Sequence, residues 1–380
     1  MERILFNHCH LVVDGKREYL DGALLVDGET IEDVFVNGNM IKNIPGEYEE
    51  IDLKGKIVMP GFFDTHCHGI KNVDFNKCCK QDISKASEEY AKHGTTSFYT
   101  TLTNDENYYD TLDTLNDCNT EYARHLGVHL EGPFISKDSR GVLKEETILD
   151  CDLEKLNEIL SHNSKVRQMT IAPEKEHSKE LIDELRKRNI KVMFGHSKAK
   201  QKDCVDKQND GYTHLFNAMS GFSHRDLGLV NMAFNDKNKY CELICDGHHI
   251  DLSVLSVALN NLRKDRIIII SDSTKMAGLD DGEFIFEGSK CMKKGTLCYK
   301  KDDGKIAGSA AFIVDGLKTM RKAGASLSDL LLMSSLNAYR LYGLDNRFGS
   351  LIKGKYADVV ILDEELNVVN TYVRGKLINA

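Results

Sequence analysis

Six residues in this chain have side chains that could bind or serve a metal ion, and they occur in five short motifs. They are His66, His68, Glu131, His196, His214 and Asp272. Each motif directly follows a short apolar run, so each side chain should emerge where a buried strand ends. Imidazole and carboxylate ligands without a thiolate suit Zn, Mn or Fe in an open catalytic site better than in a closed structural site. Their convergence would make a metallohydrolase centre.

The first motif contains two histidines separated by one residue. Side chains two residues apart lie on the same face of a strand, so His66 and His68 could reach one metal ion. The same spacing occurs in His8 and His10, where we expect two ordinary strand histidines because the pattern alone is weak. The pair at 66 and 68 differs because it follows the run PGFFD, where a strand leaves a buried core. Gly61 in that run should permit a sharp turn.

The two carboxylates have different predicted roles. Glu131 follows an apolar strand, and a carboxylate so close to the core is costly unless it is paired or metal-bound. A salt-bridged structural Glu is the alternative. Asp272 ends an apolar run with four consecutive isoleucines, from which Ser271 separates it. There it could accept a proton from a metal-activated water molecule. The alternative for Asp272 is a helix N-cap.

The chain lacks the motifs of two other classes of hydrolase. No G-x-S-x-G occurs, which argues against acyl transfer through a serine, and no GK[ST] loop occurs, which argues against nucleotide hydrolysis. Further polar residues near the motifs are candidates for substrate contacts. They are Asn217, Arg225, His248 and His249.

The motifs lie on a repeating pattern of strands and helices. Helical patterns at residues 82–93, 178–188 and 252–264 alternate with the apolar runs, which implies βαβ units and a parallel sheet. Eight strands are the number that closes a (β/α)8 TIM barrel, whose strand ends gather on one face. No G-x-G-x-x-G supports the open doubly wound alternative. The eight apolar runs lie at residues 56–64, 96–102, 125–132, 166–174, 191–197, 212–218, 241–249 and 266–273.

Short β-type runs at both ends of the chain predict a second, smaller domain. Residues 1–55 and 345–380 carry such runs, broken by Gly and Asp, and they most simply pair into one discontinuous β-sandwich. Residues 56–344 would then form the barrel. A chain of 380 residues with 41% hydrophobic content can bury one large core and a satellite.

Charge and cysteine usage limit the partners and the compartment. The formal net charge of −9 argues against nucleic acid or an anionic membrane as a partner, although local cations could still hold a small anion. Eleven cysteines without a C-x-x-C pair predict reduced thiols. The N-terminus lacks the pattern of a signal peptide, and no apolar run approaches the ~20 residues of a membrane span. We therefore expect a soluble, cytoplasmic protein.

The motifs together resemble a known family. PGFFDTHCHG, HLEGPF, TIAPE, GHS, THLFNAMS, DGHHID, SDS and IAGSA occur in the order found in the N-acetylglucosamine-6-phosphate deacetylases of the amidohydrolase superfamily. The tail LNAYRLYGLDNRFGSLIKGKYADVVILD is also similar, so the likeness covers essentially the whole chain. The resemblance implies hydrolysis of the linear amide of N-acetyl-D-glucosamine 6-phosphate to D-glucosamine 6-phosphate and acetate, a step of amino sugar metabolism.

The resemblance also implies a metal centre and a general base. The principal ion would be held by Glu131, His196 and His214. Where a second ion also binds, it would be held by His66 and His68. The expected cofactor is therefore one or two divalent ions per subunit, with zinc as the first choice and Mn, Fe or Co as alternatives. The residue that matches the family's general base and acid is Asp272.

The same resemblance implies the contacts to an amino sugar phosphate. In the family, the residue that matches Arg225 reaches across a dimer interface, so a homodimer with Arg225 in the neighbouring active site is expected. The residues implied to line or contact the substrate pocket are Val142, Asn217, Ala218, Arg225, Asp246, His249, Ile306, Ala307 and Gly308.

Two departures from the family pattern leave the substrate open. Leu143 stands where the family usually carries a His or Gln that holds the acetamide, and Asn337 begins Asn-Ala-Tyr-Arg where the family has Asn-Pro-Ala-Arg. The alternatives are another N-acetylated sugar phosphate, such as N-acetylgalactosamine 6-phosphate, or a cyclic amide as in dihydroorotase-like relatives. A non-catalytic sugar-phosphate sensor is a third alternative, although a sensor would not need Asp272.

Overall fold

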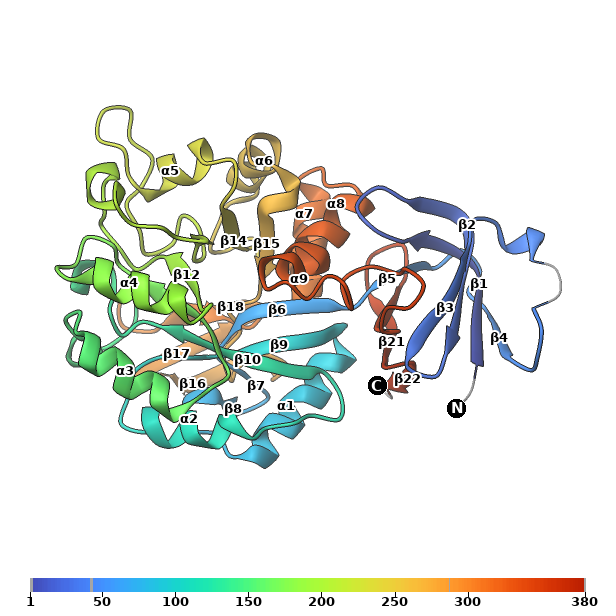
Figure 1. Cartoon of the computed structure of the whole chain (residues 1–380), viewed down its shortest axis with the longest axis horizontal. Coiled ribbons are helices and arrows are strands. Elements are labelled where there is room, and N and C mark those ends of the chain that lie inside the picture. Colours follow the sequence, from blue (N-terminus) through green and yellow to red (C-terminus); the bar gives the residue numbers. More distant parts are fainter. Residues whose placement is uncertain (1–2, 42–43, 287, 379–380) are drawn as a thin grey trace.

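Eight parallel strands, packed side by side in one sheet, form the centre of the molecule (Figure 1). The computed structural model describes residues 3–41, 44–286 and 288–378. Each of the eight predicted apolar runs overlaps a strand of this sheet, so the predicted barrel is confirmed. The strands are β6 (Phe62–Cys67), β9 (Thr95–Leu102), β10 (Arg124–Glu131), β11 (Val166–Ile171), β12 (Lys191–Phe194), β13 (Gly211–Tyr212), β14 (Tyr240–Ile244) and β15 (Ile267–Ile270).

The sheet closes where its first and last strands meet. The order runs from β15 through the sequential neighbours to β6. The backbone N–H of Asp272 donates to the carbonyl of His66 at 2.9 Å, and the Ser271 hydroxyl donates to the Asp64 carboxylate. These bonds place the first motif, after β6, next to the last motif, after β15.

Helices follow most barrel strands and cover the outside of the barrel. The three helical patterns expected from the sequence correspond to α1, α4 and α6. After β12 the connection contains only the 3₁₀ turn Gln201–Cys204 among its described residues, and a π-helical turn, Leu332–Leu336, joins α8 to α9. The helices are α1 (Lys80–Lys92), α2 (Tyr108–Asn116), α3 (Leu153–His162), α4 (Ser178–Lys187), α5 (Leu229–Asn235), α6 (Leu252–Asn261), α7 (Ile313–Lys322), α8 (Leu327–Leu331) and α9 (Asn337–Leu341).

Both ends of the chain join in a second sheet beside the barrel, where Figure 1 shows the two termini. Its strand β5 pairs in parallel with β1 and antiparallel with β20, so the two terminal segments meet through β5. This confirms the predicted β-sandwich formed from both termini. The strands are β1 (Arg3–Val12), β2 (Glu18–Asp27), β3 (Thr30–Phe35), β4 (Glu49–Asp52), β5 (Ile57–Pro60), β20 (Val359–Leu362), β21 (Val368–Val373) and β22 (Lys376–Ile378).

The first apolar run is divided between the two sheets at Gly61. β5 belongs to the terminal sheet, and β6 begins the barrel. A side chain at position 61 would meet Thr96 Oγ1 at 2.2 Å, so the glycine is required by close approach to the neighbouring strand rather than by a left-handed turn. The predicted domain boundary at residue 55 assigns β5 to the barrel segment. In the structure, β5 pairs with β1 and β20 of the terminal sheet.

A small antiparallel sheet lies between β15 and α7 and was not predicted. It contains four strands that pair in sequence order, and a separate pair of short strands follows β6. Phe286 and residues 306 and 308 of this sheet line the cavity described below. The strands are β16 (Gly282–Phe286), β17 (Ser289–Lys294), β18 (Leu297–Lys300) and β19 (Ile306–Ser309), with β7 (Gly69–Ile70) and β8 (Val73–Asp74) as the short pair.

Polar side chains fill part of the barrel interior below the motifs. His129 lies between Thr101, at 3.2 Å from Nδ1, and Thr170, at 2.8 Å from Nε2. Thr170 also contacts the Thr213 hydroxyl at 2.8 Å. Buried polar groups that satisfy one another in this way fix side-chain orientations. The layer forms a rigid support directly beneath the strand ends.

The cysteines are unpaired thiols, most of them inside the protein. All eleven cysteines are free, and ten of them are buried. Burial raises the pKa of Cys9, Cys204 and Cys241 to about 12, so these thiols are protonated and unreactive. Within the described ranges, no helix is long and apolar enough to cross a membrane.

Candidate metal centre

The predicted ligands meet at the carboxyl ends of the barrel strands. Glu131 is the last residue of β10, while His196, His214 and Asp272 each lie two positions after the last residue of β12, β13 and β15. The last three have φ values of 46°, 30° and 50°. Left-handed backbone at residues other than glycine is uncommon, costs about 1–3 kcal/mol and persists mainly at functional sites. The strand ends therefore turn sharply to aim these side chains inward.

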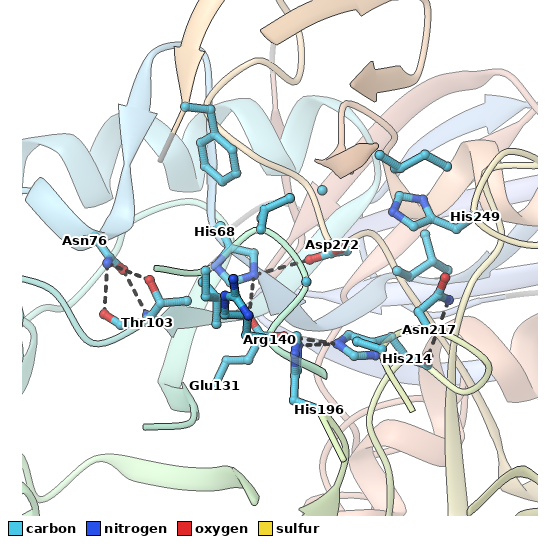
Figure 2. A pocket seen from close by; sticks show the side chains of 18 of the residues that line it. His68, Asn76, Thr103, Glu131, Arg140, His196, His214, Asn217, His249 and Asp272 are labelled. Carbon is cyan, nitrogen blue, oxygen red and sulfur yellow. Dashed lines mark hydrogen bonds and ion pairs between the residues drawn. The ribbon is translucent and has the colours of Figure 1, made fainter. Parts of the chain in front are cut away.

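Glu131, His196 and His214 form a tight cluster. Glu131 Oε1 lies 2.9 Å from His196 Nε2 and 3.1 Å from His214 Nε2, and the two Nε2 atoms are 3.0 Å apart. All three side chains are buried. The three atoms could hold one metal ion, and Figure 2 shows these residues converging from separate strand ends.

The tautomer of His196 shows why a cation fits between these atoms. His196 Nδ1 lies 2.7 Å from the carbonyl oxygen of Ser139, which can only accept, so Nδ1 carries the hydrogen. In a neutral ring, Nε2 then presents a lone pair to Glu131 Oε1, which also presents lone pairs. Two facing acceptors repel each other unless a positive charge lies between them. The residues present therefore fit a divalent ion.

His66 and His68 form a second cluster around the other side of Glu131. Their Nε2 atoms are 3.3 Å apart, and they lie 3.4 Å from Oε1 and 3.3 Å from Oε2 of Glu131, respectively. This group could also hold an ion. Burial raises the pKa of Glu131, but the His66 and His196 imidazoles lower it well below its usual range. The carboxylate is therefore ionised and can be shared between two cations.

Asp272 faces the second cluster. Its Oδ1 lies 3.2 Å from His68 Nε2 and 3.5 Å from His66 Nε2. Burial raises the pKa of Asp272, but the His68 and His66 rings lower it below its usual value. The side chain points at the cluster and lines the cavity, and its hydrogen bonds are not those of an N-cap. An ionised carboxylate in this position can accept a proton from a group bound in the cavity.

His249 and Asp246 form a buried pair near the cavity. His249 Nδ1 lies 2.8 Å from Asp246 Oδ2, and Asp246 also accepts the backbone N–H groups of His248 and His249. Burial lowers the pKa of His249, but the bond to Asp246 raises it above its usual value. His249 is therefore held in its cationic form to higher pH than a free imidazole, which suits an anionic group.

One cavity brings most of the predicted residues together. Figure 2 shows Asn217 and His249 on one side of the cluster, with Asn76 and Thr103 on the other. His66 lies beneath the cavity floor and is fully buried. The predicted residues that line the cavity are His68, Glu131, Val142, His196, His214, Asn217, Ala218, His249, Asp272, Ile306 and Gly308.

Other predicted residues do not line this cavity. Asp246 contacts it through His249, and Ala307 is buried between two lining residues. Arg225 and His248 are exposed on loops of this single chain. The contact predicted for Arg225 involves a neighbouring subunit, so it stays a prediction.

The lining residues that were not predicted from the sequence are Asp74, Asn76, Thr103, Arg140, Gly141, Ile244 and Phe286. Thr103 directly follows the apolar run of β9, so the rule that found the other motifs could have found it. Asn76 donates to Thr103 Oγ1 at 2.8 Å and to its carbonyl at 2.9 Å, which braces the two loops. Asn76 and Phe286 come from segments with no local signal of a site.

His8 and His10 test the meaning of the His-x-His spacing. Each pairs with a carboxylate in the terminal sheet, His8 with Asp21 at 2.9 Å and His10 with Glu18 at 2.7 Å. Neither belongs to a group that could hold a metal ion among the described residues. Both residues lie in β1, as expected of strand histidines, and an ion pair accounts for each ring.

The chain is similar to known proteins along almost its whole length. A model of the amidohydrolase family matches residues 57–378. N-acetylgalactosamine-6-phosphate deacetylase from Escherichia coli O157:H7 is 30% identical over 353 residues, which cover 89% of this chain and 91% of that protein. N-acetylglucosamine-6-phosphate deacetylase from Bos taurus is 31% identical over 99% of this chain and 95% of its own. The crystal structure of N-acetylglucosamine-6-phosphate deacetylase from Pasteurella multocida has a TM-score of 0.91 and 27% identity, covering 99% of each chain.

Proposed function

The chain belongs to the amidohydrolase family, and from this premise we propose that it removes acetate from N-acetyl-D-glucosamine 6-phosphate. The products are D-glucosamine 6-phosphate and acetate. The observation that carries the proposal is that Asp272 faces the cluster of His66, His68 and Glu131 within one cavity. The relatives named above are deacetylases of N-acetylated hexosamine 6-phosphates.

The metal would be held by residues that the chain already brings together. Glu131, His196 and His214 would hold the principal ion, and His66 and His68, again with Glu131, would hold the second. Zinc is our first choice, because nitrogen and oxygen ligands without thiolates suit it, and Mn, Fe or Co could replace it. When bound, a divalent ion here polarises the amide carbonyl and acidifies a water molecule.

Asp272 would move the protons of the reaction. It takes one proton from the attacking water while the water oxygen bonds to the acetyl carbon. It then donates this proton to the amide nitrogen as the C–N bond breaks, because an amine cannot leave as an anion. The immediate products are the free amine and acetic acid, which still carries the second proton of the water. Acetic acid then gives this proton to the amine or to solvent and becomes acetate, so the atoms balance.

The sugar phosphate would be anchored away from the reacting bond. The cationic His249 and the turn at Asn217 and Ala218 lie on one side of the cluster. Arg225 of a second copy would add a charge-assisted contact to the phosphate, which makes the working enzyme a homodimer. Binding energy from this remote group positions the acetyl carbon.

The galactosamine epimer is a second candidate substrate. One relative at 30% identity is an N-acetylgalactosamine-6-phosphate deacetylase, and Leu143 lines the cavity where a polar acetamide contact was expected. We also propose a cytoplasmic location, because the eleven free thiols suit a reducing compartment.

Acetate release from a panel of substrates tests the proposal. Purified enzyme with Zn or Mn is given N-acetylglucosamine 6-phosphate, its galactosamine epimer, unphosphorylated N-acetylglucosamine and dihydroorotate. We expect the phosphorylated sugars to give the highest kcat/KM and the unphosphorylated sugar a value lower by at least about tenfold, from one lost charged contact. Ring opening of dihydroorotate, or sugar-phosphate binding without acetate release, would contradict the proposal.

A further inference from the structure

Glu242 is a carboxylate buried inside the barrel, one layer below the metal centre. It lies in β14, and its side chain is 0% exposed. Oε1 accepts the Thr65 hydroxyl at 3.1 Å and the Gln168 amide at 3.0 Å. A buried carboxylate is costly unless its charge and lone pairs are matched. Two neutral donors on one oxygen leave the second oxygen to be explained.

The second oxygen faces His66. Glu242 Oε2 lies 3.6 Å from His66 Nδ1, and both side chains are 0% exposed. Neither atom has a hydrogen-bond partner among the described residues. A shift of a few tenths of an ångström would bring the pair within hydrogen-bond reach. The unmatched acceptor and the unmatched ring nitrogen are therefore complementary.

The surrounding network fixes which atoms face each other. The Tyr342 hydroxyl donates to Gln168 Oε1, so the amide nitrogen of Gln168 must point to Glu242. Gln168 in turn holds Glu242 Oε1, which directs Oε2 at His66. The chain of contacts runs from the end of α9 to the metal centre.

We propose that Glu242 is a positioning residue for the second metal position. It accepts the Nδ1 hydrogen of His66 and so keeps the lone pair of His66 on Nε2, the atom that faces His68 and Glu131 at 3.3 and 3.4 Å. Metal-ligating histidines commonly donate their other ring N–H to such a carboxylate, which fixes the ring and its tautomer. The inference rests on the proposed metal centre.

The isosteric substitution Glu242→Gln tests the proposal, because it should reverse the direction of the hydrogen bond between residue 242 and His66. Because Gln168 still offers its amide N–H, the oxygen of the introduced amide would face Gln168 and its NH₂ group would face His66 Nδ1. That donor would force the hydrogen of His66 onto Nε2 and block the second metal position. The variant thus reverses one hydrogen bond with little change in shape.

The experiment is cobalt binding to metal-free full-length enzyme, followed by absorption and by chelator competition. We expect Glu242→Gln to weaken the second ion about 10–100-fold, the usual effect of such partners, and to change the first ion by less than about threefold. In the His66→Asn background, which should bind a single ion, the same substitution should leave the affinity for that ion unchanged. Glu50→Gln is the matched control, because it makes the same change at a carboxylate of the terminal sheet that accepts the Asn7 amide at 2.7 Å, and it should leave the affinities for both ions unchanged.

Several results would overturn the assignment. They are an unchanged affinity for the second ion in Glu242→Gln, equal weakening of both ions, or wild-type enzyme that binds no second ion even with excess metal. The last result leaves the deacetylase function standing if acetate is still released. If the variant does not fold, nitrogen NMR of wild-type histidines decides, with His66 assigned from His66→Asn. Hydrogen on Nδ1 supports the role of Glu242, and hydrogen on Nε2 refutes it. Failure of acetate release with all substrates would instead refute the proposed function.

Discussion

Glu131 Oε1 lies 2.9 Å from His196 Nε2 although His196 donates its other ring hydrogen to the Ser139 carbonyl. When the His196 ring is neutral, its Nε2 lone pair therefore faces a lone pair of Glu131 in a buried site, which is unfavourable unless a proton or a metal cation lies between them. Because Glu131 and His196 come from the ends of different strands, metal binding at this contact should also stabilise the way these strand ends pack together. An ion that binds here should hold together residues from β10, β12 and β13.

Removal of metal should abolish activity and lower stability together. Dialysis against a strong chelator should remove acetate release, and Zn or Mn should restore it. An ion that binds only the native state stabilises it by about 4 kcal/mol at a thousandfold excess over its Kd, so Tm should fall in the metal-free enzyme. Differential scanning calorimetry and elemental analysis check this. Full activity in metal-free enzyme would contradict the proposed centre.

Two ions should bind per subunit, the second more weakly. We expect occupancy to rise from one to two with excess Zn or Mn, with the ions about 3.5–4 Å apart as in other two-metal sites. His66→Asn should return the occupancy to one. His10→Asn is the matched control, because His10 pairs only with Glu18 in the terminal sheet. If one ion binds under all conditions and His66→Asn keeps full activity, the pair is structural.

Arg225→Ala should mainly raise KM for the phosphorylated substrate. One charge-assisted contact is worth roughly 1.5–3 kcal/mol, so the increase should be at least about tenfold, with little change for the unphosphorylated sugar. Arg17→Ala serves as the control, because Arg17 is exposed and pairs with Asp14 in the turn between β1 and β2. Sedimentation should show a dimer in all variants, and a fully active monomer would contradict the shared site.

Phosphate binding should weaken at high pH through His249. The bond to Asp246 raises the pKa of His249, so the cationic form and its attraction to phosphate persist at low and neutral pH. They are lost as pH rises through this raised value, and KM should increase there. Asp246→Asn should move the increase to lower pH. KM for unphosphorylated N-acetylglucosamine should show neither effect, and a KM that follows the same pH curve for both sugars would exclude His249.

The sequence predicted the residues that follow strands better than those inside them. Asp272 and His196 come directly after apolar runs, so their place at the barrel mouth follows from the strand pattern alone. Glu242 lies within the run CELIC, and Gln168 lies within VRQMTI. Strands of a parallel barrel are buried on both faces, so their pattern does not show which residues point inward. These interior residues were found only from the structure.

The small sheet between β15 and α7 was missed for a different reason. Its strands are four to six residues long, and the sequences of β17 (SKCMKK) and β18 (LCYK) show no regular alternation of apolar and polar residues. Phe286 enters the cavity from this sheet, well after the motif at Asp272 in the sequence. A contact of this kind depends on how an insertion folds back over the barrel. Local residue patterns do not contain that information.

The final prediction concerns Asp272 and separates an enzyme from a sensor. Asp272→Asn should lower kcat while substrate binding stays nearly unchanged, because a general base acts in the chemical step. Such assistance typically contributes about 10²–10⁴-fold. Asp272 would serve in both proton transfers, so we expect a loss near the top of this range. Asn keeps the shape and the backbone bond to His66, so the fold should survive.

Steady-state kinetics and the pH profile of kcat check the role of Asp272. The limb of the profile that belongs to this carboxylate should disappear in Asp272→Asn, because an amide does not take up the proton. Metal content should be measured in parallel, since Asp272 lies 3.2 Å from His68 and a lost ion would also lower kcat. If the variant with full metal content retains more than about a tenth of wild-type kcat, well above what general-base removal permits, Asp272 is only a supporting residue of the second metal position.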